Sequence, residues 1–180
     1  DLLRHDQLDL VFKGLDTFAE VYVNDSMIGR GDNMFRTWEW PVKGLLRKGD
    51  NKLQVIFRSP IKAGAKLRDA YGIQLPHDSD PSGVSPYIRK AAYQFGWDFC
   101  PRLVTSGIWK DVVLRAWSTT RIERFDVDAV PNADTMALSL RVVLPGQLSE
   151  GYSVRFLLND LMLAQVPVRE VEGRSVAEYV

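Results

Sequence analysis

Apolar and polar residues alternate with a period of two over much of the chain, which predicts β-strands. Within the first two thirds, the segments with this pattern are residues 8–12, 19–23, 34–40, 53–57 and 108–117. Turn-forming residues separate these segments, as at residues 13–16 and 24–26. Short strands joined by turns are typical of an all-β sandwich.

One segment departs from this pattern. Ser59 is a suitable N-cap and Pro60 a suitable first helical residue, so residues 60–70 are predicted to form a short helix. Residues 76–86, rich in Pro, Ser, Asp and Gly, are predicted to form a loop, and long loops in compact domains are often binding loops. The loop begins with His77, Asp78, Ser79 and Asp80, but calcium prefers ~6–8 oxygen ligands, so a solvated loop without metal is favoured.

The alternation continues in a second unit. It includes residues 125–129, 136–144 and 152–158, and residues 159–160 predict a hairpin leading to further strands. We place the boundary so that residues 1–118 and 119–180 form separate domains. An immunoglobulin-type sandwich has about seven strands in ~100 residues. With four or five expected strands, the second unit is predicted to be an incomplete immunoglobulin-like sandwich.

The charge balance narrows the possible partners. The chain has 23 basic and 23 acidic side chains, whereas binders of nucleic acid or anionic membrane surfaces are usually basic. No apolar run approaches the ~20 residues of a membrane span.

The single Cys100 excludes an internal disulfide and leaves the compartment open. It could act as a nucleophile only beside a base, and His5 and His77 are the only histidines, so a packing role is favoured.

Trp97 and Asp98 form the most informative pair in the chain. Gly96 and Pro101 bend the segment around them. An indole offers a flat apolar face for the C–H surface of a sugar ring, and a carboxylate accepts hydrogen bonds from its hydroxyls. The alternative for this pair alone is a core tryptophan beside a surface aspartate.

Besides the Trp97-Asp98 motif, the chain has four other tryptophans and a basic pair. Trp38, Trp40, Trp109 and Trp117 are expected to serve packing or a domain interface, although Trp38 and Trp40 share one strand face. For Arg89 and Lys90 two readings remain. They reach sugar hydroxyls or hold Asp98 through a charge-assisted bond, or they form a solvated or interface-pairing basic pair.

Ordered motifs across residues 8–117 resemble the amino-terminal domain of glycoside hydrolase family 2, and in particular that of the β-mannosidases. The motifs are LVFKGLDT (10–17), VYVN (21–24), GDNMFR (31–36), IRKAAYQFGWDF (88–99) and GIWKDV (107–112). The β-mannosidase stretch has Trp-Asp-Trp-Gly-Pro, whereas Phe99 and Cys100 occupy the third and fourth positions here. Phe99 lacks the indole N–H, and Cys100 makes a left-handed backbone costly.

The resemblance implies a galactose-binding-like jelly-roll sandwich followed by the start of an immunoglobulin-like domain. It also implies a longer chain, an exo-acting retaining β-mannosidase that removes terminal β-D-mannose with both catalytic carboxylates in a (β/α)₈ barrel. In that reading the catalytic barrel of the same chain is the partner, this piece alone is inactive, and no cofactor is required. Trp97 lines the sugar site and Asp98 accepts hydrogen bonds from mannose. A β-galactosidase, a β-glucuronidase, a free carbohydrate-binding module and a structural domain remain as alternatives.

Overall fold

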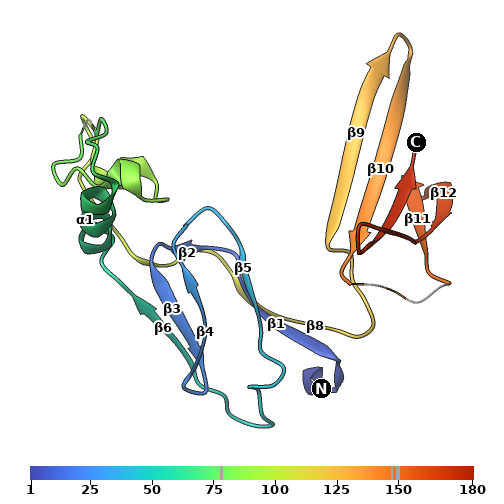
Figure 1. Ribbon diagram of the computed structural model, residues 1–180, viewed down its shortest axis with the longest axis horizontal. Helices are drawn as coiled ribbons and strands as arrows, with labels where there is room; N and C mark the ends of the chain where they lie inside the picture. The colour runs from blue at the N-terminus through green and yellow to red at the C-terminus, as the bar shows by residue number, and fades with distance from the viewer. Residues whose placement is uncertain (78, 147, 149–150) are drawn as a thin grey trace. The chain divides into compact units, whose positions relative to one another are not determined.

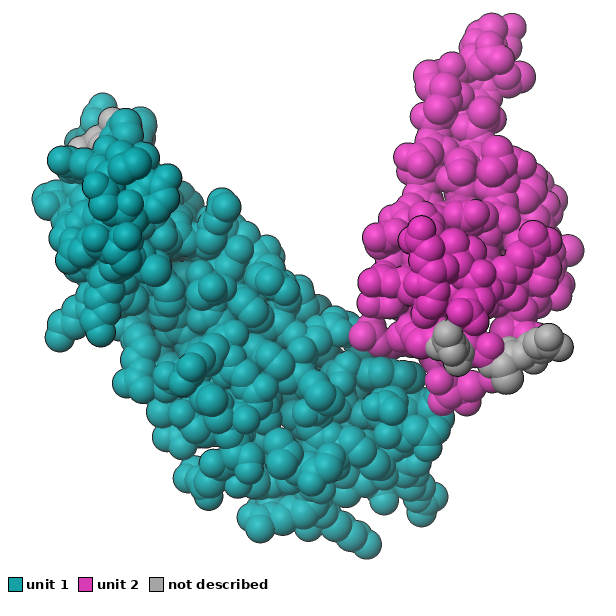
Figure 2. Space-filling view, in the orientation of Figure 1, with its two compact units in different colours: residues 1–118 teal, residues 119–180 magenta. Residues whose placement is uncertain are grey.

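The computed structural model describes residues 1–77, 79–146, 148 and 151–180. The chain divides into two compact units, residues 1–118 and residues 119–180 (Figure 2). Each unit has its own hydrophobic core. Strands make up most of the regular structure of both units, so the all-β prediction is confirmed.

Unit 1 contains three antiparallel sheets. Its strands are β1 (Gln7–Phe12), β2 (Leu15–Asp16), β3 (Ala19–Val23), β4 (Ser26–Gly31), β5 (Trp38–Pro41), β6 (Leu53–Phe57), β7 (Gly107–Ile108) and β8 (Val112–Trp117). The strand orders are β5-β1-β8, β4-β3-β6 and β2-β7. A short 3-10 helix, η1 (Leu2–Arg4), precedes β1.

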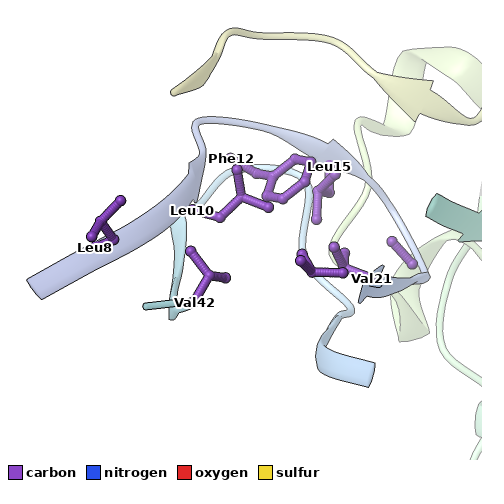
Figure 3. Close-up of a cluster of buried hydrophobic side chains, with 8 residues drawn as sticks. Leu8, Leu10, Phe12, Leu15, Val21 and Val42 are labelled. Carbon is purple, nitrogen blue, oxygen red and sulfur yellow. The ribbon is translucent and has the colours of Figure 1, made fainter. Parts of the chain in front are cut away.

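The core of unit 1 lies between the two three-stranded sheets (Figure 3). Alternate residues of β1 and of β3 point into one cluster, as the period of two requires. The buried members are Leu8, Leu10, Phe12, Leu15, Ala19, Val21, Val23 and Val42. Because both sheets contribute to one cluster, unit 1 is a β-sandwich.

The strands with strict alternation, residues 8–12, 19–23 and 53–57, form as predicted. Residues 24 and 25 join β3 to β4, and Asn24 and Asp25 have φ values of 48° and 67°. Positive φ at both central positions is the signature of a tight hairpin turn.

Three segments differ from the sequence predictions. The strand expected from residue 34 begins only at Trp38, because Asn33 Oδ1 accepts the Phe35 N–H at 2.9 Å and turns the chain. Residues 13–16 were expected to form a turn, but Leu15–Asp16 is β2, paired with β7. Strand β4 was missed because its sequence, SMIGRG, contains two glycines and little alternation.

Glycines opposite the large indoles explain how the tryptophans pack. A side-chain carbon at Gly29 would lie 2.2 Å from Trp40, and one at Gly14 would lie 2.4 Å from Trp109 Nε1. Trp38 and Trp40 stack at 5.8 Å between ring centroids and pack against the core. The expected packing role of this pair is confirmed.

Between β6 and β7 the chain makes a long excursion, residues 58–106, gathered at the end of unit 1 away from the N-terminus (Figure 1). Its helix α1 (Pro60–Tyr71) confirms the predicted helix, and the Ser59 side chain caps it by accepting the Lys62 N–H. Two 3-10 helices follow, η2 (Ser85–Tyr87) and η3 (Ala92–Phe95). No helix in the described residues is long and apolar enough to cross a membrane.

A second, smaller core holds the excursion together. Its buried residues are Val84, Ile88 and Phe95, and Phe18, Ile61, Ala65 and Val104 pack against them. Phe18 lies just before β3, so the small core joins the excursion to the sandwich.

The loop before η2 is organised by Asp80. Its carboxylate, 2% exposed, accepts the N–H groups of Ser82, Val84 and Ser85 at 2.8–2.9 Å, and also the Ser82 hydroxyl. Burial acts to raise the pKa of Asp80, but these hydrogen bonds outweigh it and lower the pKa from 3.8 to about 2. The solvated loop expected here is therefore wrong for Asp80, while Asp78 lies outside the described residues.

Unit 2 consists of β9 (Arg124–Asn132), β10 (Thr135–Leu144), β11 (Ser153–Leu158), β12 (Leu161–Pro167), β13 (Arg169–Val171) and β14 (Arg174–Tyr179). The described residues thus form six strands, not the four or five expected. The sheets have the orders β13-β14-β10-β9 and β11-β12 and enclose Leu140, Val142, Leu144 and Phe156. Asn159 and Asp160, with φ of 47° and 66°, form the predicted hairpin turn between β11 and β12.

The lowered pKa of Asp80 predicts a pH-dependent contribution to stability. One pKa unit corresponds to ~1.4 kcal/mol, so Asp80→Asn should lower the free energy of unfolding by about 2 kcal/mol at pH 7. The contribution of a depressed carboxyl is fully present above 3.8 and is lost as the pH falls through about 2.

Urea unfolding at pH 7 and pH 3 checks this, and the difference between wild type and variant should shrink by about half at pH 3. Asp50→Asn, at an exposed turn position, is the matched control and should leave stability unchanged. A difference that is equal at both pH values would contradict the assignment.

Candidate functional site

Residues 95–103, here called the finger, carry the Trp97-Asp98 pair. The finger starts at Phe95, which is 1% exposed in the small core of the excursion. A turn closed by the Cys100 N–H on the Trp97 carbonyl, at 3.2 Å, forms its tip. Asp98 and Phe99 are the two central residues of this turn, and they project from the tip.

The candidate side chains of the finger are exposed. Trp97 is 53% exposed and Phe99 84% exposed. The Asp98 carboxylate is also exposed and has no hydrogen-bond partner in the part of the chain that the structure describes. The Trp97 indole is therefore not buried in the core of unit 1, and the Asp98 carboxylate is not bonded to a described residue.

The backbone of the finger bends at Gly96. This residue has φ of 116°, and a side-chain carbon there would lie 3.3 Å from the Ser79 carbonyl oxygen, so both conformation and space favour glycine. Cys100 does not adopt a positive φ. The cost expected for replacing a glycine at that position therefore does not arise in this conformation.

Hydrogen bonds close the base of the finger. The Leu103 N–H donates to the Gln94 carbonyl at 3.0 Å, and the Thr105 N–H donates to Gln94 Oε1 at 3.3 Å. Arg102 also reaches the 76–86 loop, where it donates to Ser82 Oγ at 3.0 Å and lies 3.6 Å from Asp80. Both ends of the finger are therefore anchored to the rest of the excursion.

Beneath this base lies a buried ion pair between Asp16 of β2 and Lys90. The side chains are 5% and 0% exposed. Lys90 Nζ donates to both Asp16 carboxylate oxygens and to the Thr105 carbonyl oxygen at 2.7 Å, so all three ammonium protons have acceptors. Burial lowers the pKa of Lys90 below 10.5, although the hydrogen bonds and charge of Asp16 oppose the shift.

The same carboxylate contacts both sides of the finger. Gln94 Nε2 donates to Asp16 Oδ2 at 3.3 Å. The Thr105 hydroxyl lies 3.3 Å from Asp16 Oδ2 and 2.8 Å from Gln94 Oε1. We call Asp16, Lys90, Gln94 and Thr105 the Asp16 network.

These contacts correct one reading of the basic pair. Lys90 was considered as a partner of Asp98 or as a solvated cation, but it is buried and bonded to Asp16. Arg89 is exposed, and its carbonyl oxygen accepts the Met34 N–H at 3.0 Å. Neighbouring residues on an extended segment point to opposite sides, which places one basic side chain inside and the other outside.

A pocket of about 390 Å³ opens beside the finger. It combines apolar surfaces with polar groups and is lined by Pro76, His77, Ser79, Asp80, Ser85, Pro86, Ala92, Tyr93, Phe95, Gly96 and Trp97. The buried Nδ1 atom of His77 has no hydrogen-bond partner within the described residues. The described side chains include no group of three His, Cys, Asp or Glu suited to a metal ion.

Sequence reasoning singled out Trp97 and Asp98 as candidates but missed the residues that anchor their segment. Asp16 was taken as part of a turn, and Gln94 and Thr105 were not considered. Lys90 lies 74 residues from Asp16 in the sequence, so no local pattern connects them. The only signal available was the resemblance of residues 10–17 and 88–99 to two motifs of one family.

Comparisons with known proteins identify the family of the chain. The family model described as glycosyl hydrolase 2 galactose-binding domain-like matches residues 1–110. A β-mannosidase B of Aspergillus niger is 31% identical over 185 residues, covering 99% of this chain and 22% of that protein. A β-mannosidase of Capra hircus is 34% identical over 131 residues, covering 69% of this chain and 15% of that protein.

Solved structures show the same fold. The crystal structure of a β-D-mannosidase from Dictyoglomus thermophilum has a TM-score of 0.83 and 34% identity, covering 98% of this chain and 22% of that one. A β-galacturonidase from Eisenbergiella tayi, with a TM-score of 0.59 and 18% identity, shares the fold alone. This chain spans about a fifth of the length of the curated relatives that it matches first. Because the family model matches more than half of the chain, the chain belongs to glycoside hydrolase family 2, with residues 1–110 as its galactose-binding-like domain.

Proposed function

We propose that the full-length protein containing this chain is a retaining exo-β-mannosidase, and that the finger contributes Trp97 and Asp98 to the subsite for the terminal mannose. One observation carries this proposal. An exposed indole and an exposed carboxylate without an internal partner in the described residues stand on an anchored finger beside a pocket. The similarity to proteins named β-mannosidase supports mannoside as the substrate class.

Trp97 suits the apolar face of a pyranose. Its indole lines the pocket and still exposes 53% of its surface. Stacking a sugar ring on an indole buries apolar C–H groups, and the ring has only two side-chain torsions to immobilise. The polar groups that share the pocket, such as the hydroxyls of Ser79 and Ser85, match the polar edge of the same ring.

Asp98 suits the hydroxyls of the sugar. Its two carboxylate oxygens can accept hydrogen bonds from a vicinal diol. Hydrogen bonds to a charged acceptor are each worth about 1.5–3 kcal/mol. Such contacts accelerate hydrolysis only if they strengthen as the ring distorts toward the transition state.

The hydrolytic chemistry itself requires other residues. Retention uses two carboxyl groups about 5–5.5 Å apart, one as nucleophile and one as acid/base. In our proposal a (β/α)₈ barrel elsewhere in the full-length chain supplies both, and unit 1 positions the substrate against it.

Two alternatives follow from particular observations. Likeness in fold to a β-galacturonidase keeps another glycoside as a possible substrate. Binding modules share jelly-roll folds, so a free carbohydrate-binding module is the second alternative. The similarity to β-mannosidases across 98–99% of this chain favours the mannosidase.

The first prediction concerns Asp98. In the full-length protein, Asp98→Ala should lower kcat/KM on 4-nitrophenyl β-D-mannopyranoside about ten- to a hundredfold, the equivalent of one or two charge-assisted bonds. Asp111→Ala is the control, because Asp111 is an exposed aspartate outside the finger that is paired with Lys13 of the sandwich. An unchanged kcat/KM for Asp98→Ala would remove Asp98 from the site.

The second prediction concerns Trp97. Trp97→Ala should lower kcat/KM by at least about tenfold, whereas Trp97→Phe, which keeps an apolar ring, should lose less. Steady-state kinetics on the same substrate measures both variants. Tyr71→Ala, at another exposed aromatic residue of unit 1, should have no effect. Equal losses for Tyr71→Ala and Trp97→Ala would argue against a specific stacking role.

The third prediction concerns substrate class. The full-length protein should hydrolyse the aryl β-mannoside with a higher kcat/KM than the aryl β-galactoside or β-glucuronide, because mannose differs from galactose in configuration at C2 and C4, and from glucuronate in configuration at C2 and in lacking a carboxylate at C6. A panel of the three substrates under identical conditions tests this. Preference for either competitor would replace mannoside in the proposal.

A further inference from the structure

We propose that Asp16 is a positioning residue for the sugar-binding finger. The segment before the finger, here called the entering stem, contains Lys90 and Gln94, and the segment after it, the leaving stem, contains Thr105. The buried Asp16 carboxylate contacts both stems through these three residues. The inference rests on the proposed function of Trp97 and Asp98.

The position of Asp16 in the fold supports this role. It lies in β2, where it pairs with Gly107 of β7, the strand through which the excursion rejoins the sandwich. Asp16 is therefore attached to a strand pair of the sandwich and not to a free loop. A carboxylate fixed to a strand can orient a loop more closely than one attached to another loop.

The contacts of Asp16 reach both stems at once. Lys90 Nζ bonds Asp16 and also the Thr105 carbonyl oxygen at 2.7 Å. Gln94 bonds Asp16 through its amide nitrogen, and its amide oxygen accepts from Thr105. The entering stem is thus bonded both to Asp16 and to the leaving stem, while the single hydroxyl proton of Thr105 is shared between Gln94 Oε1 at 2.8 Å and Asp16 Oδ2 at 3.3 Å. Together these bonds fix the separation and the relative orientation of the two stems.

A purely stabilising role explains this arrangement poorly. Removing two charges from water offsets much of the attraction between them, so apolar residues would hold the same place about as well. Apolar contacts have no direction, whereas the hydrogen bonds of one carboxylate fix the stems in angle as well as distance. Substrate-positioning groups need such fixation, because a displacement of ~1 Å can cost about a hundredfold in rate.

The decisive variants keep the ion pair and remove the other side-chain contacts of the Asp16 network. Thr105→Val deletes the hydroxyl that contacts Gln94 and Asp16, while the Thr105 carbonyl oxygen still accepts from Lys90. Gln94→Met deletes the bond from Gln94 Nε2 to Asp16 and the two bonds that Gln94 Oε1 accepts from Thr105. We expect each variant of the full-length protein to lower kcat/KM on the aryl β-mannoside by about five- to tenfold. Thr105→Ser keeps the hydroxyl and should restore the wild-type value.

A double-mutant cycle separates positioning from stability and from the proposed function. In a Trp97→Ala/Asp98→Ala background, Thr105→Val should have no further effect, because the groups that it positions are gone. Full additivity, or no effect of Thr105→Val and Gln94→Met in the wild-type background, would overturn the positioning role while leaving the function of the finger intact. An unchanged kcat/KM for the Trp97→Ala/Asp98→Ala protein would overturn the proposed function and this inference with it.

Val21→Ala serves as the control for stability. Val21 is 0% exposed in the core of the sandwich, outside the finger and the Asp16 network. It should lower the melting temperature at least as much as Thr105→Val and leave kcat/KM unchanged at a temperature where both variants are folded. An equal loss of kcat/KM in Val21→Ala would show that instability alone explains the result.

Discussion

One buried carboxylate, that of Asp16, joins parts of unit 1 that lie far apart in the sequence. Its partners Lys90, Gln94 and Thr105 are 74, 78 and 89 residues away. A charge in the interior is tolerated only when it is paired and its remaining lone pairs are satisfied, and Asp16 meets both conditions. The stems of the finger are therefore constrained, because each must present a donor to this carboxylate.

This constraint explains how an all-β scaffold carries an irregular excursion of about fifty residues. The sandwich has its own core, built from β1 and β3. The excursion has a second core around Phe95, which is too small to fix the geometry of a loop by itself. Where the excursion returns to the sandwich, β7 pairs with β2. Asp16 in β2 binds Lys90, Gln94 and Thr105, which flank the finger. The polar network thus supplies the orientation that the small core lacks.

The sequence predicted those parts of unit 1 whose signals are local. Alternation in residues 19–23 marked β3, and Ser59 with Pro60 marked the start of α1. Strand β4 carries two glycines and β2 has only two residues, so neither offered a periodic signal. The Trp97-Asp98 pair was proposed from its motif and stays a prediction. The pairing of Asp16 with Lys90 could not be found, because the two side chains are 74 residues apart and only the tertiary fold brings them together.

Three aspartates of unit 1 show why burial and partners decide function where residue type does not. Asp16 and Asp80 are buried, and their oxygens accept hydrogen bonds from the protein itself. Asp98 is exposed, and no donor in the described residues binds its carboxylate. Because the carboxylates of Asp16 and Asp80 already accept hydrogen bonds from the protein, a ligand would have to break those bonds before binding. Asp98 keeps its hydrogen-bonding capacity, which is why we propose it as the acceptor for a sugar, and the bonds of Asp16 and Asp80 hold the segments around the finger.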